Sequence, residues 1–325
     1  LLPLMSTLAC VTGDDTGLCK YVTLAPPALI NRWGEQAAGN GVGSICWGPS
    51  GEAFVGAGLG TGVVRFWKAS AGPSMAGGSQ ADGASVYEYA ATAAGSAGIV
   101  AVHAAAARVA ACNRSGHVSV WAWQDEIGGE GACAGDPLTH FETQTRDVAA
   151  SRFFAAGEQV ALGGKGAEVS IWDVESMHSI FRARNLSNDE LDLPVPVWLT
   201  ALALDRHEPK RLVTGHGFVQ QRLRGEVRLY DWAAQRRPVM RTMAPLDEEA
   251  ISAVALSPDG HSVYAGSVSG NLARLDVRKS LKPLERFKGC AGSIREIAVH
   301  PTLPLVGCAA LDRMLRVYNC RTGSL

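Results

Sequence analysis

Charged residues and long hydrophobic runs are both scarce in this sequence. Asp, Glu, Lys and Arg make up 19% of its 325 residues, and 30 basic side chains almost balance 31 acidic ones. The most apolar long stretch, residues 97–112, is mostly alanine and is interrupted by His103 and Arg108, so it falls short of a membrane-spanning helix. These features argue against a membrane protein, a coiled coil and a disordered chain of high net charge.

Motifs for catalysis and metal binding are absent as well. The eight cysteines form no C-x-x-C pair, and the eight histidines are scattered singly, without the spacing of metal ligands. Gly56–Gly62 fits neither common phosphate-binding pattern, and there is no G-x-S-x-G motif. The sequence therefore predicts no enzyme, cofactor, metal site or small-molecule substrate. We expect the cysteines to be small buried hydrophobic residues in a reducing compartment, and Leu1–Met5 lacks the features of a signal peptide.

Glycine is abundant, at 37 residues, and internal repeats account for it. Seven segments share one plan: an apolar strand, a turn, a Gly/Ala-rich strand, a polar turn and a third strand. One repeat runs from Ile251–Gly260 through Ser262–Ser267 to Leu272–Val277, with Ser-Pro-Asp-Gly at its first turn. Alternating strands place every second side chain between neighbouring sheets, and small residues in the second strand let those sheets approach closely.

An aromatic residue or a leucine marks the third strand of every repeat. Successive marker positions are 43 to 58 residues apart, compared with roughly 40–45 in WD repeats. Trp172 and Tyr230 are each followed by the Asp of the dipeptide that names these repeats. The pattern predicts an all-β fold, a seven-bladed WD-repeat β-propeller. The marker residues are Tyr21, Trp67, Trp121, Trp172, Tyr230, Leu275 and Tyr318.

We expect one propeller domain over residues 1–325, with an insertion at 184–198 between the fourth and fifth blades. The first blade lacks an obvious innermost strand before Met5, and the seventh ends without an outer strand. We therefore expect either further residues beyond position 325 or a partial closure of the ring. The approximate blade ranges are 1–30, 40–70, 95–125, 146–183, 195–242, 250–288 and 292–325.

The near-zero net charge hides an uneven distribution. Residues 205–245 carry nine basic and four acidic side chains, and eight of the nine basic residues are arginines. Arginine forms bidentate contacts with phosphate and carboxylate groups, so this cluster could contact an RNA backbone or an acidic partner. A solvated blade edge explains the same residues equally well.

Two insertions interrupt the repeats. Five apolar side chains fall within residues 191–198, so the segment 184–198 is too apolar for an idle linker. We expect this segment to cover the propeller, to enter it as a strand or to contact a partner, because binding residues are commonly placed on loops of a rigid scaffold. Residues 216–225 lengthen the turn before the third strand of the fifth blade. The apolar residues are Leu191, Leu193, Val195, Val197 and Trp198.

The segment 184–198 also carries a family resemblance. It reads Arg-Asn-Leu-Ser-Asn-Asp-Glu-Leu-Asp-Leu-Pro-Val-Pro-Val-Trp. It resembles the N-x-x-N-D-x-L-D-L-x-V-P-x-W segment of the nucleolar WD-repeat assembly factors of the large ribosomal subunit. The similarity is clearest over residues 170–320. It continues through Glu226–Asp231, Gln235–Pro238, Gly289–Arg295 and Leu311–Arg316.

This resemblance implies a non-catalytic scaffold that docks on early pre-60S ribosomal particles in the nucleolus and nucleus. It further implies contacts with other ribosome assembly factors and with the backbone of pre-rRNA, and removal by a AAA ATPase. The chain departs from the family in its longer turn around residues 218–224 and in lacking the family's basic C-terminal tail. The candidate partner-binding residues are Asn188, Asp189, Leu191, Asp192, Pro196, Trp198, Arg222, Arg224, Arg228, Arg236, Arg237, Arg295, Arg313 and Arg316.

The rival interpretation is a general propeller adaptor, such as a ubiquitin-ligase substrate receptor or a histone-binding platform. A substrate receptor would usually carry an Arg just after the WD dipeptide. Here Trp172-Asp173 is followed by Val174, and Tyr230-Asp231 is followed by Trp232. Affinity purification would separate the two interpretations, because an adaptor would enrich cullin adaptors or histones instead of large-subunit assembly factors.

Overall fold

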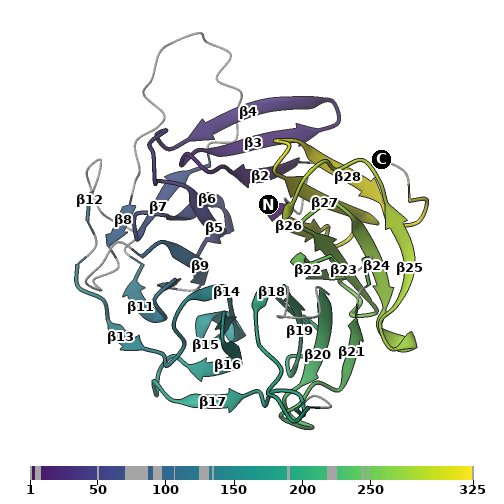
Figure 1. Cartoon of the computed structure of the whole chain (residues 1–325). Helices are drawn as coiled ribbons and strands as arrows, with labels where there is room; N and C mark the ends of the chain where they lie inside the picture. The colour runs from purple at the N-terminus through teal and green to yellow at the C-terminus, as the bar shows by residue number, and fades with distance from the viewer. Residues whose placement is uncertain are drawn as a thin grey trace.

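The computed structural model is built almost entirely of β-strands (Figure 1). The two helical elements among the described residues are single 3-10 turns, η1 (Ala155–Gly157) and η2 (Val277–Lys279). Within the described part of the chain, no helix has the length and hydrophobicity to cross a membrane. The structure describes residues 2–3, 9–49, 51–69, 87–90, 97–105, 107–123, 132–133, 135–188, 191–217, 225–243, 245–246 and 249–323.

Seven sheets form the blades of a ring, which confirms the predicted seven-bladed propeller (Figure 1). The first blade contains β1 (Leu2–Pro3), β2 (Ala9–Gly13), β3 (Cys19–Leu24) and β4 (Pro27–Trp33). The second contains β5 (Val42–Gly48), β6 (Gly51–Leu59), β7 (Val63–Lys68), β8 (Tyr87–Ala90) and β12 (Ala132–Cys133). The third contains β9 (Ile99–Ala105), β10 (Arg108–Asn113), β11 (His117–Ala122) and β13 (Thr139–Glu142).

The remaining blades follow the same plan. The fourth contains β14 (Val148–Phe154), β15 (Gln159–Gly164), β16 (Ala167–Asp173) and β17 (Ser179–Arg182). The fifth contains β18 (Leu199–Leu204), β19 (Arg211–His216), β20 (Glu226–Asp231) and β21 (Met240–Met243). The sixth contains β22 (Ile251–Leu256), β23 (Ser262–Ser267), β24 (Leu272–Asp276) and β25 (Lys282–Phe287). The seventh contains β26 (Ile294–Val299), β27 (Leu305–Ala310) and β28 (Leu315–Asn319).

The direction of the chain distinguishes the two faces of the ring. Within each blade the main strands are antiparallel and follow one another from the central axis outward. We call the face at which the innermost strands begin the top face. The turns between second and third strands lie at this face, and the turns between third and fourth strands lie at the opposite, bottom face.

A glycine in the second strand lets one blade approach the next. A Cβ atom at Gly163 would lie 2.7 Å from Leu199, and a Cβ at Gly215 would lie 2.6 Å from Ile251. Leu199 and Ile251 are the first residues of the innermost strands of the following blades. These distances leave no room for a side chain, so glycine is required by the close approach of the blades. The same pairing recurs between Gly13 and Val42, Gly58 and Ile99, and Gly266 and Ile294.

The hydrophobic core lies between adjacent blades. Six of the seven marker residues of the third strands are at most 6% exposed, as the repeat pattern predicts. Hydroxyl groups add polar links between innermost strands: Thr200 donates to the carbonyl oxygen of Ile251 at 2.7 Å, and Ser252 donates to that of Ile294 at 2.7 Å. The buried markers are Trp67, Trp121, Trp172, Tyr230, Leu275 and Tyr318.

An ion pair joins two blades that are not neighbours in the ring. Arg152 belongs to the innermost strand of the fourth blade and Glu296 to that of the seventh. The Nη2 atom of Arg152 lies 3.0 Å from Oε1 of Glu296, so the pair bridges the centre of the ring.

The ends of the chain and two long connections differ from the sequence-based expectations. The two-residue strand β1 supplies the innermost strand that was not recognised before Met5. Among the described residues the seventh blade has three strands, as expected. The outer strands β8 and β13 lie beyond the ranges expected for the second and third blades, 40–70 and 95–125. Long connections separate them from their third strands, so a search for a regular repeat misses them.

Candidate docking surface

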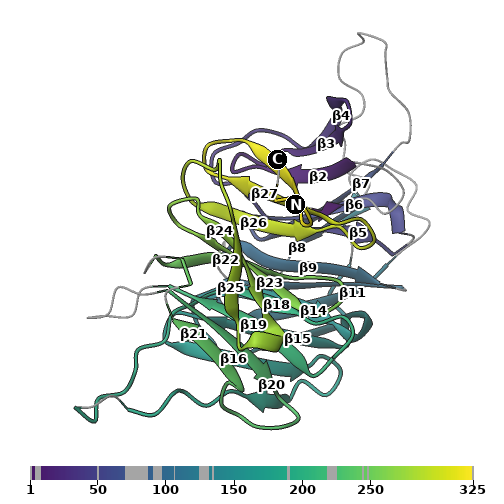
Figure 2. The same cartoon turned by 90° about the vertical axis from the view of Figure 1, so that its right-hand side faces the viewer.

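The segment 184–198 connects β17, the outermost strand of the fourth blade, to β18, the innermost strand of the fifth. Two hydrogen bonds hold its end at the top face. The amide of Gly166 donates to the carbonyl oxygen of Val197 at 2.8 Å, and the amide of Gly217 donates to that of Trp198 at 2.9 Å. Figure 2 shows the segment projecting from the body of the ring.

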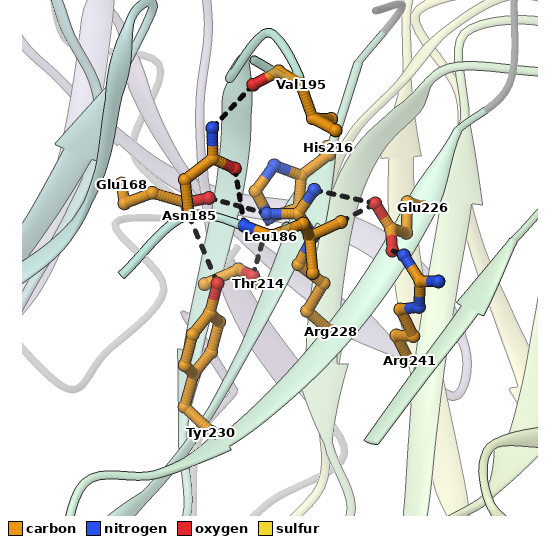
Figure 3. Close-up of polar contacts among 10 residues, drawn as sticks. All are labelled: Glu168, Asn185, Leu186, Val195, Thr214, His216, Glu226, Arg228, Tyr230 and Arg241. Atoms are coloured by element: carbon orange, nitrogen blue, oxygen red, sulfur yellow. Dashed lines mark hydrogen bonds and ion pairs between the residues drawn. The ribbon is translucent and has the colours of Figure 1, made fainter. Parts of the chain in front are cut away.

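A further hydrogen bond closes the segment into a loop with a narrow neck. The Nδ2 atom of Asn185 donates to the carbonyl oxygen of Val195 at 2.6 Å (Figure 3). Inside this loop, Nδ2 of Asn188 donates to the backbone oxygen of Asp192 at 3.1 Å and to its Oδ1 at 2.9 Å. Asn188 and Asp192, both candidate partner contacts, therefore shape the loop. Asp189 lies outside the described residues.

The loop presents large apolar side chains to solvent. Leu191 is 76% exposed, Leu193 is 50% exposed and Trp198 is 39% exposed, and Pro196 is exposed beside them. Apart from an isolated antiparallel β-bridge between Trp198 and Lys165, the described residues of the loop form no strand. Several large apolar side chains exposed on one loop are typical of an interaction site.

Trp198 has a defined orientation although it is partly exposed. Its ring packs on Gly217, where a Cβ atom would lie 3.1 Å from Cδ2 of the indole. The Nζ atom of Lys165 lies 5.9 Å from the ring centroid, within the range of a cation–π contact. A fixed indole beside an ammonium group suits a ligand that combines an apolar surface with a negative charge.

Arg228, a candidate surface cation, is buried in β20. Its side chain is 1% exposed, and Nη1 lies 2.6 Å from Oε1 of Glu168 in β16 of the preceding blade (Figure 3). Its Nε and Nη2 atoms donate to Oε2 of Glu226 at 2.9 and 2.8 Å. The hydroxyl of Tyr230 donates to Oε2 of Glu168 at 3.1 Å. Because alternation along β20 turns Arg228 toward the fourth blade, it joins two blades, and we leave it out of the docking surface.

The same burial sets the charge states in this cluster. Burial raises the pKa of the Glu168 carboxyl, and the positive charge of Arg228 acts against it. Burial acts to lower the pKa of Arg228, but its two glutamate partners raise it above its ordinary value. His216 is 0% exposed, and its Nε2 atom lies 2.9 Å from the hydroxyl of Thr214. Burial holds the pKa of His216 well below 6.5, so the imidazole is neutral at neutral pH.

Other arginines of the fifth blade do reach the surface. Arg236 and Arg237 are exposed in the turn between β20 and β21. The carbonyl oxygen of Arg236 accepts a hydrogen bond from the amide of Arg184 at 2.8 Å, and its Nε donates to the carbonyl oxygen of Arg182 at 2.9 Å. Exposed arginines therefore surround the start of the segment 184–198. Two candidates lie outside the described residues, Arg222 and Arg224.

The seventh blade adds two more exposed cations at the top face. Arg295 is the second residue of β26, and Arg313 lies in the turn between β27 and β28. The side chain of Arg316 is 16% exposed, and its Nη1 lies 2.6 Å from Oδ2 of Asp312. Asp312 also accepts hydrogen bonds from two backbone amides, so it stabilises its turn. Arg316 thus faces inward, whereas Arg295 and Arg313 are accessible.

Comparisons with known proteins identify the family. No family model matches the chain. The chain is 32% identical over 313 residues to WD repeat-containing protein 74 of Bos taurus, which covers 95% of this chain and 74% of that protein. The chain belongs to the WD repeat-containing protein 74 family. The family resemblance found in the sequence is thereby confirmed.

A second relative of this WD repeat-containing protein 74 family member is a ribosome biogenesis protein. The chain is 25% identical over 192 residues to Ribosome biogenesis protein NSA1 of Yarrowia lipolytica, covering 50% of this chain and 45% of that protein. A chain in the crystal structure of the mitotic checkpoint complex superimposes with a TM-score of 0.71 at 17% identity, covering 95% of this chain and 82% of that one. That likeness supports the propeller fold alone.

The structure of this family member also reveals residues at the docking surface that the sequence did not single out. Lys165 lies beside Trp198, and Leu311 and Met314 are 62% and 56% exposed on either side of Arg313. Leu311 and Met314 lie in a turn at the top face, where the repeat pattern requires no apolar side chain. An apolar residue within such a turn is the signal that would have revealed them.

The chemistry available at this surface is that of binding. In the ranges that the structure describes, no three His, Cys, Asp or Glu side chains converge as metal ligands would. The accessible groups are apolar side chains on an anchored loop, together with guanidinium groups at the rim and the top face. Such a surface can bury apolar area against a partner and pair its arginines with phosphate or carboxylate groups.

Proposed function

We propose that this chain is a non-catalytic WD-repeat scaffold in the biogenesis of the large ribosomal subunit. Membership of the WD repeat-containing protein 74 family supports the process, and the anchored loop 184–198 is the observation that carries the mode of action. A loop closed at its neck and fixed at its end presents apolar side chains with little loss of conformational entropy on binding. The protein therefore acts by docking.

We define the docking surface by the accessible apolar and cationic candidates. Its apolar part is the loop, and its cationic part lies at the rim and on the seventh blade. We propose that it binds the pre-60S particle and other assembly factors in the nucleolus and nucleus, and that its arginines contact the backbone of pre-rRNA. The docking surface comprises Leu191, Pro196, Trp198, Arg236, Arg237, Arg295 and Arg313.

Co-sedimentation with pre-60S particles tests this proposal. The double substitution Leu191→Ser with Trp198→Ala removes the largest exposed apolar groups, and we expect about a tenfold loss of particle-bound protein, as for the removal of an interface hot spot. The matched control is Leu138→Ser, because Leu138 is 62% exposed and precedes β13, away from the loop. Unchanged association of a folded double variant would show that the loop does not dock.

The family resemblance also suggests how the protein leaves the particle. We propose that a AAA ATPase removes it as the particle matures. In cells expressing a hydrolysis-deficient form of that ATPase, the protein should accumulate on late particles, and it should shift from the nucleolus to the nucleoplasm with them. Normal release under that condition would exclude the ATPase, while affinity purification of large-subunit factors would still support the scaffold function.

A further inference from the structure

Two cysteine side chains meet at the contact between the sixth and seventh blades. Cys290 lies in the connection between β25 and β26, and Cys308 lies in β27. Their Sγ atoms are 3.3 Å apart. Both thiols are free. Among the cysteines that the structure describes, these are the two whose sulfur atoms contact each other.

The two thiols differ in their access to solvent. Cys308 is 1% exposed, whereas Cys290 is partly exposed. A small reagent therefore reaches Cys290 first, and Cys308 is positioned behind it. The Sγ atom of Cys290 also lies 3.6 Å from the hydroxyl of Tyr318, which donates to the carbonyl oxygen of Lys288 at 3.0 Å. These contacts hold the connection, and with it Cys290, against the seventh blade.

A cation lies close to the thiol pair. Cys308 pairs with Arg316 across the β27–β28 ladder, so their side chains share one face of the sheet. Burial raises the pKa of the Cys308 thiol, and the positive charge of Arg316 acts to lower it. The pKa of Cys308 is raised on balance, and Arg316 supplies a positive charge next to the thiol pair.

We propose that Cys290 and Cys308 form a modification site at which hydrogen peroxide creates an intramolecular disulfide. The Cys290 thiolate attacks one peroxide oxygen, the O–O bond breaks, and the departing hydroxide takes up a proton to form water. The resulting sulfenic acid is attacked at sulfur by Cys308, so that the S–S bond forms as the S–O bond breaks and a second water leaves. Each sulfur loses one electron, and the peroxide gains two.

The disulfide would restrain the part of the docking surface that lies on the seventh blade. The connection that carries Cys290 already contacts the turn after β27, because the amide of Ala291 donates to Oδ2 of Asp312 at 3.0 Å. The same turn carries Arg313. A covalent bond between Cys290 and β27 therefore restrains the connection and the turn together. The reaction needs only the isolated protein and peroxide, so it is independent of ribosomal particles.

Peptide mapping tests the proposal directly. Trypsin releases Cys290 in the peptide 289–295 and Cys308 in the peptide 296–313, and neither peptide contains another cysteine. After treatment of the whole folded protein with hydrogen peroxide and alkylation of the remaining thiols, we expect these two peptides as a cross-linked pair. Reduction should return both peptides in alkylatable form.

Three substitutions make the result decisive. Cys290→Ser and Cys308→Ala should each abolish the cross-linked pair, and Cys320→Ser, a partly exposed cysteine in the same core region, should leave it unchanged. In Cys308→Ala, the Cys290 sulfenic acid should accumulate and be trapped by dimedone. Oxidation of Cys290 in the wild-type protein while Cys308 stays fully alkylatable would overturn the proposal, as would an unchanged pair of thiols.

Discussion

The buried guanidinium of Arg228 offers the sharpest test of how the blades are held together. Replacement by Met keeps most of the volume of the side chain and removes its charge and all of its donors. Glu168 and Glu226 would then lose their partner at 2.6 and 2.8 Å, and Glu226 would keep only the longer contact of its Oε1 atom with Nη1 of Arg241, at 3.7 Å. The change leaves every backbone strand and every exposed residue of the docking surface as it is.

The expected loss of stability follows from the burial of the cluster. The side chains of Arg228, Glu168 and Glu226 are 1%, 8% and 10% exposed, so water cannot replace the missing cation. Breaking a buried pair from one side costs about 3–5 kcal/mol, because an uncompensated charge stays in the interior. Since whole domains are stable by about 5–15 kcal/mol, Arg228→Met should remove a large share of the free energy of unfolding.

Equilibrium unfolding in urea, followed by tryptophan fluorescence, measures this loss. The control is Arg237→Met, an exposed arginine of the same blade, which should change the unfolding free energy by less than about 0.5 kcal/mol. Adding Glu168→Gln and Glu226→Gln to Arg228→Met should restore at least half of the loss, because the buried charges disappear. A loss below about 1 kcal/mol, or no recovery in the triple variant, would refute this account.

Three further predictions concern other parts of the molecule. Gly215→Val should destabilise the protein by about 2–3 kcal/mol in the same assay, because its new Cβ would overlap Ile251; a stability equal to that of the wild type would contradict the close approach. The pKa of His216 is lowered by burial. The contribution of its neutral imidazole to the free energy of unfolding is therefore complete above pH 6.5 and is lost as the pH falls below that value. Below pH 6.5 the wild type should lose up to about 1.4 kcal/mol per pH unit more than His216→Gln, and parallel pH profiles would count against a buried neutral imidazole. Arg313→Glu should weaken binding to pre-rRNA fragments and reduce its salt dependence, measured by fluorescence anisotropy at several salt concentrations, and an unchanged salt slope would exclude a phosphate contact.

Much of the fold could be predicted because the repeat is encoded in local sequence. The small residues of the second strands and the buried third-strand markers recur in most blades, the sixth blade adds the turn Ser-Pro-Asp-Gly, and all are short-range signals. The strands β8 and β13 could not be found this way, since long connections remove them from the repeat. β1 was missed because two residues carry no periodicity.

The candidate site was less predictable, for a physical reason. Whether an arginine faces solvent depends on the neighbouring blade, which sequence position does not reveal. Arg228 and Arg237 belong to one arginine-rich stretch, yet the first pairs with Glu168 of the preceding blade and the second is exposed. The loop 184–198 was easier to select, because its apolar residues fall outside the repeat pattern.

The glycine contacts between blades have a consequence for the whole ring. The first residue of the next blade packs directly on each such glycine. Every contact of this kind therefore determines the angle between two neighbouring blades around the ring axis. In a closed ring the angles between neighbouring blades add up to a full rotation. If one angle becomes larger, the other angles must therefore become smaller. The spacing of residues far apart on the top face, such as Trp198 and Arg313, is therefore determined by glycines that never touch a partner.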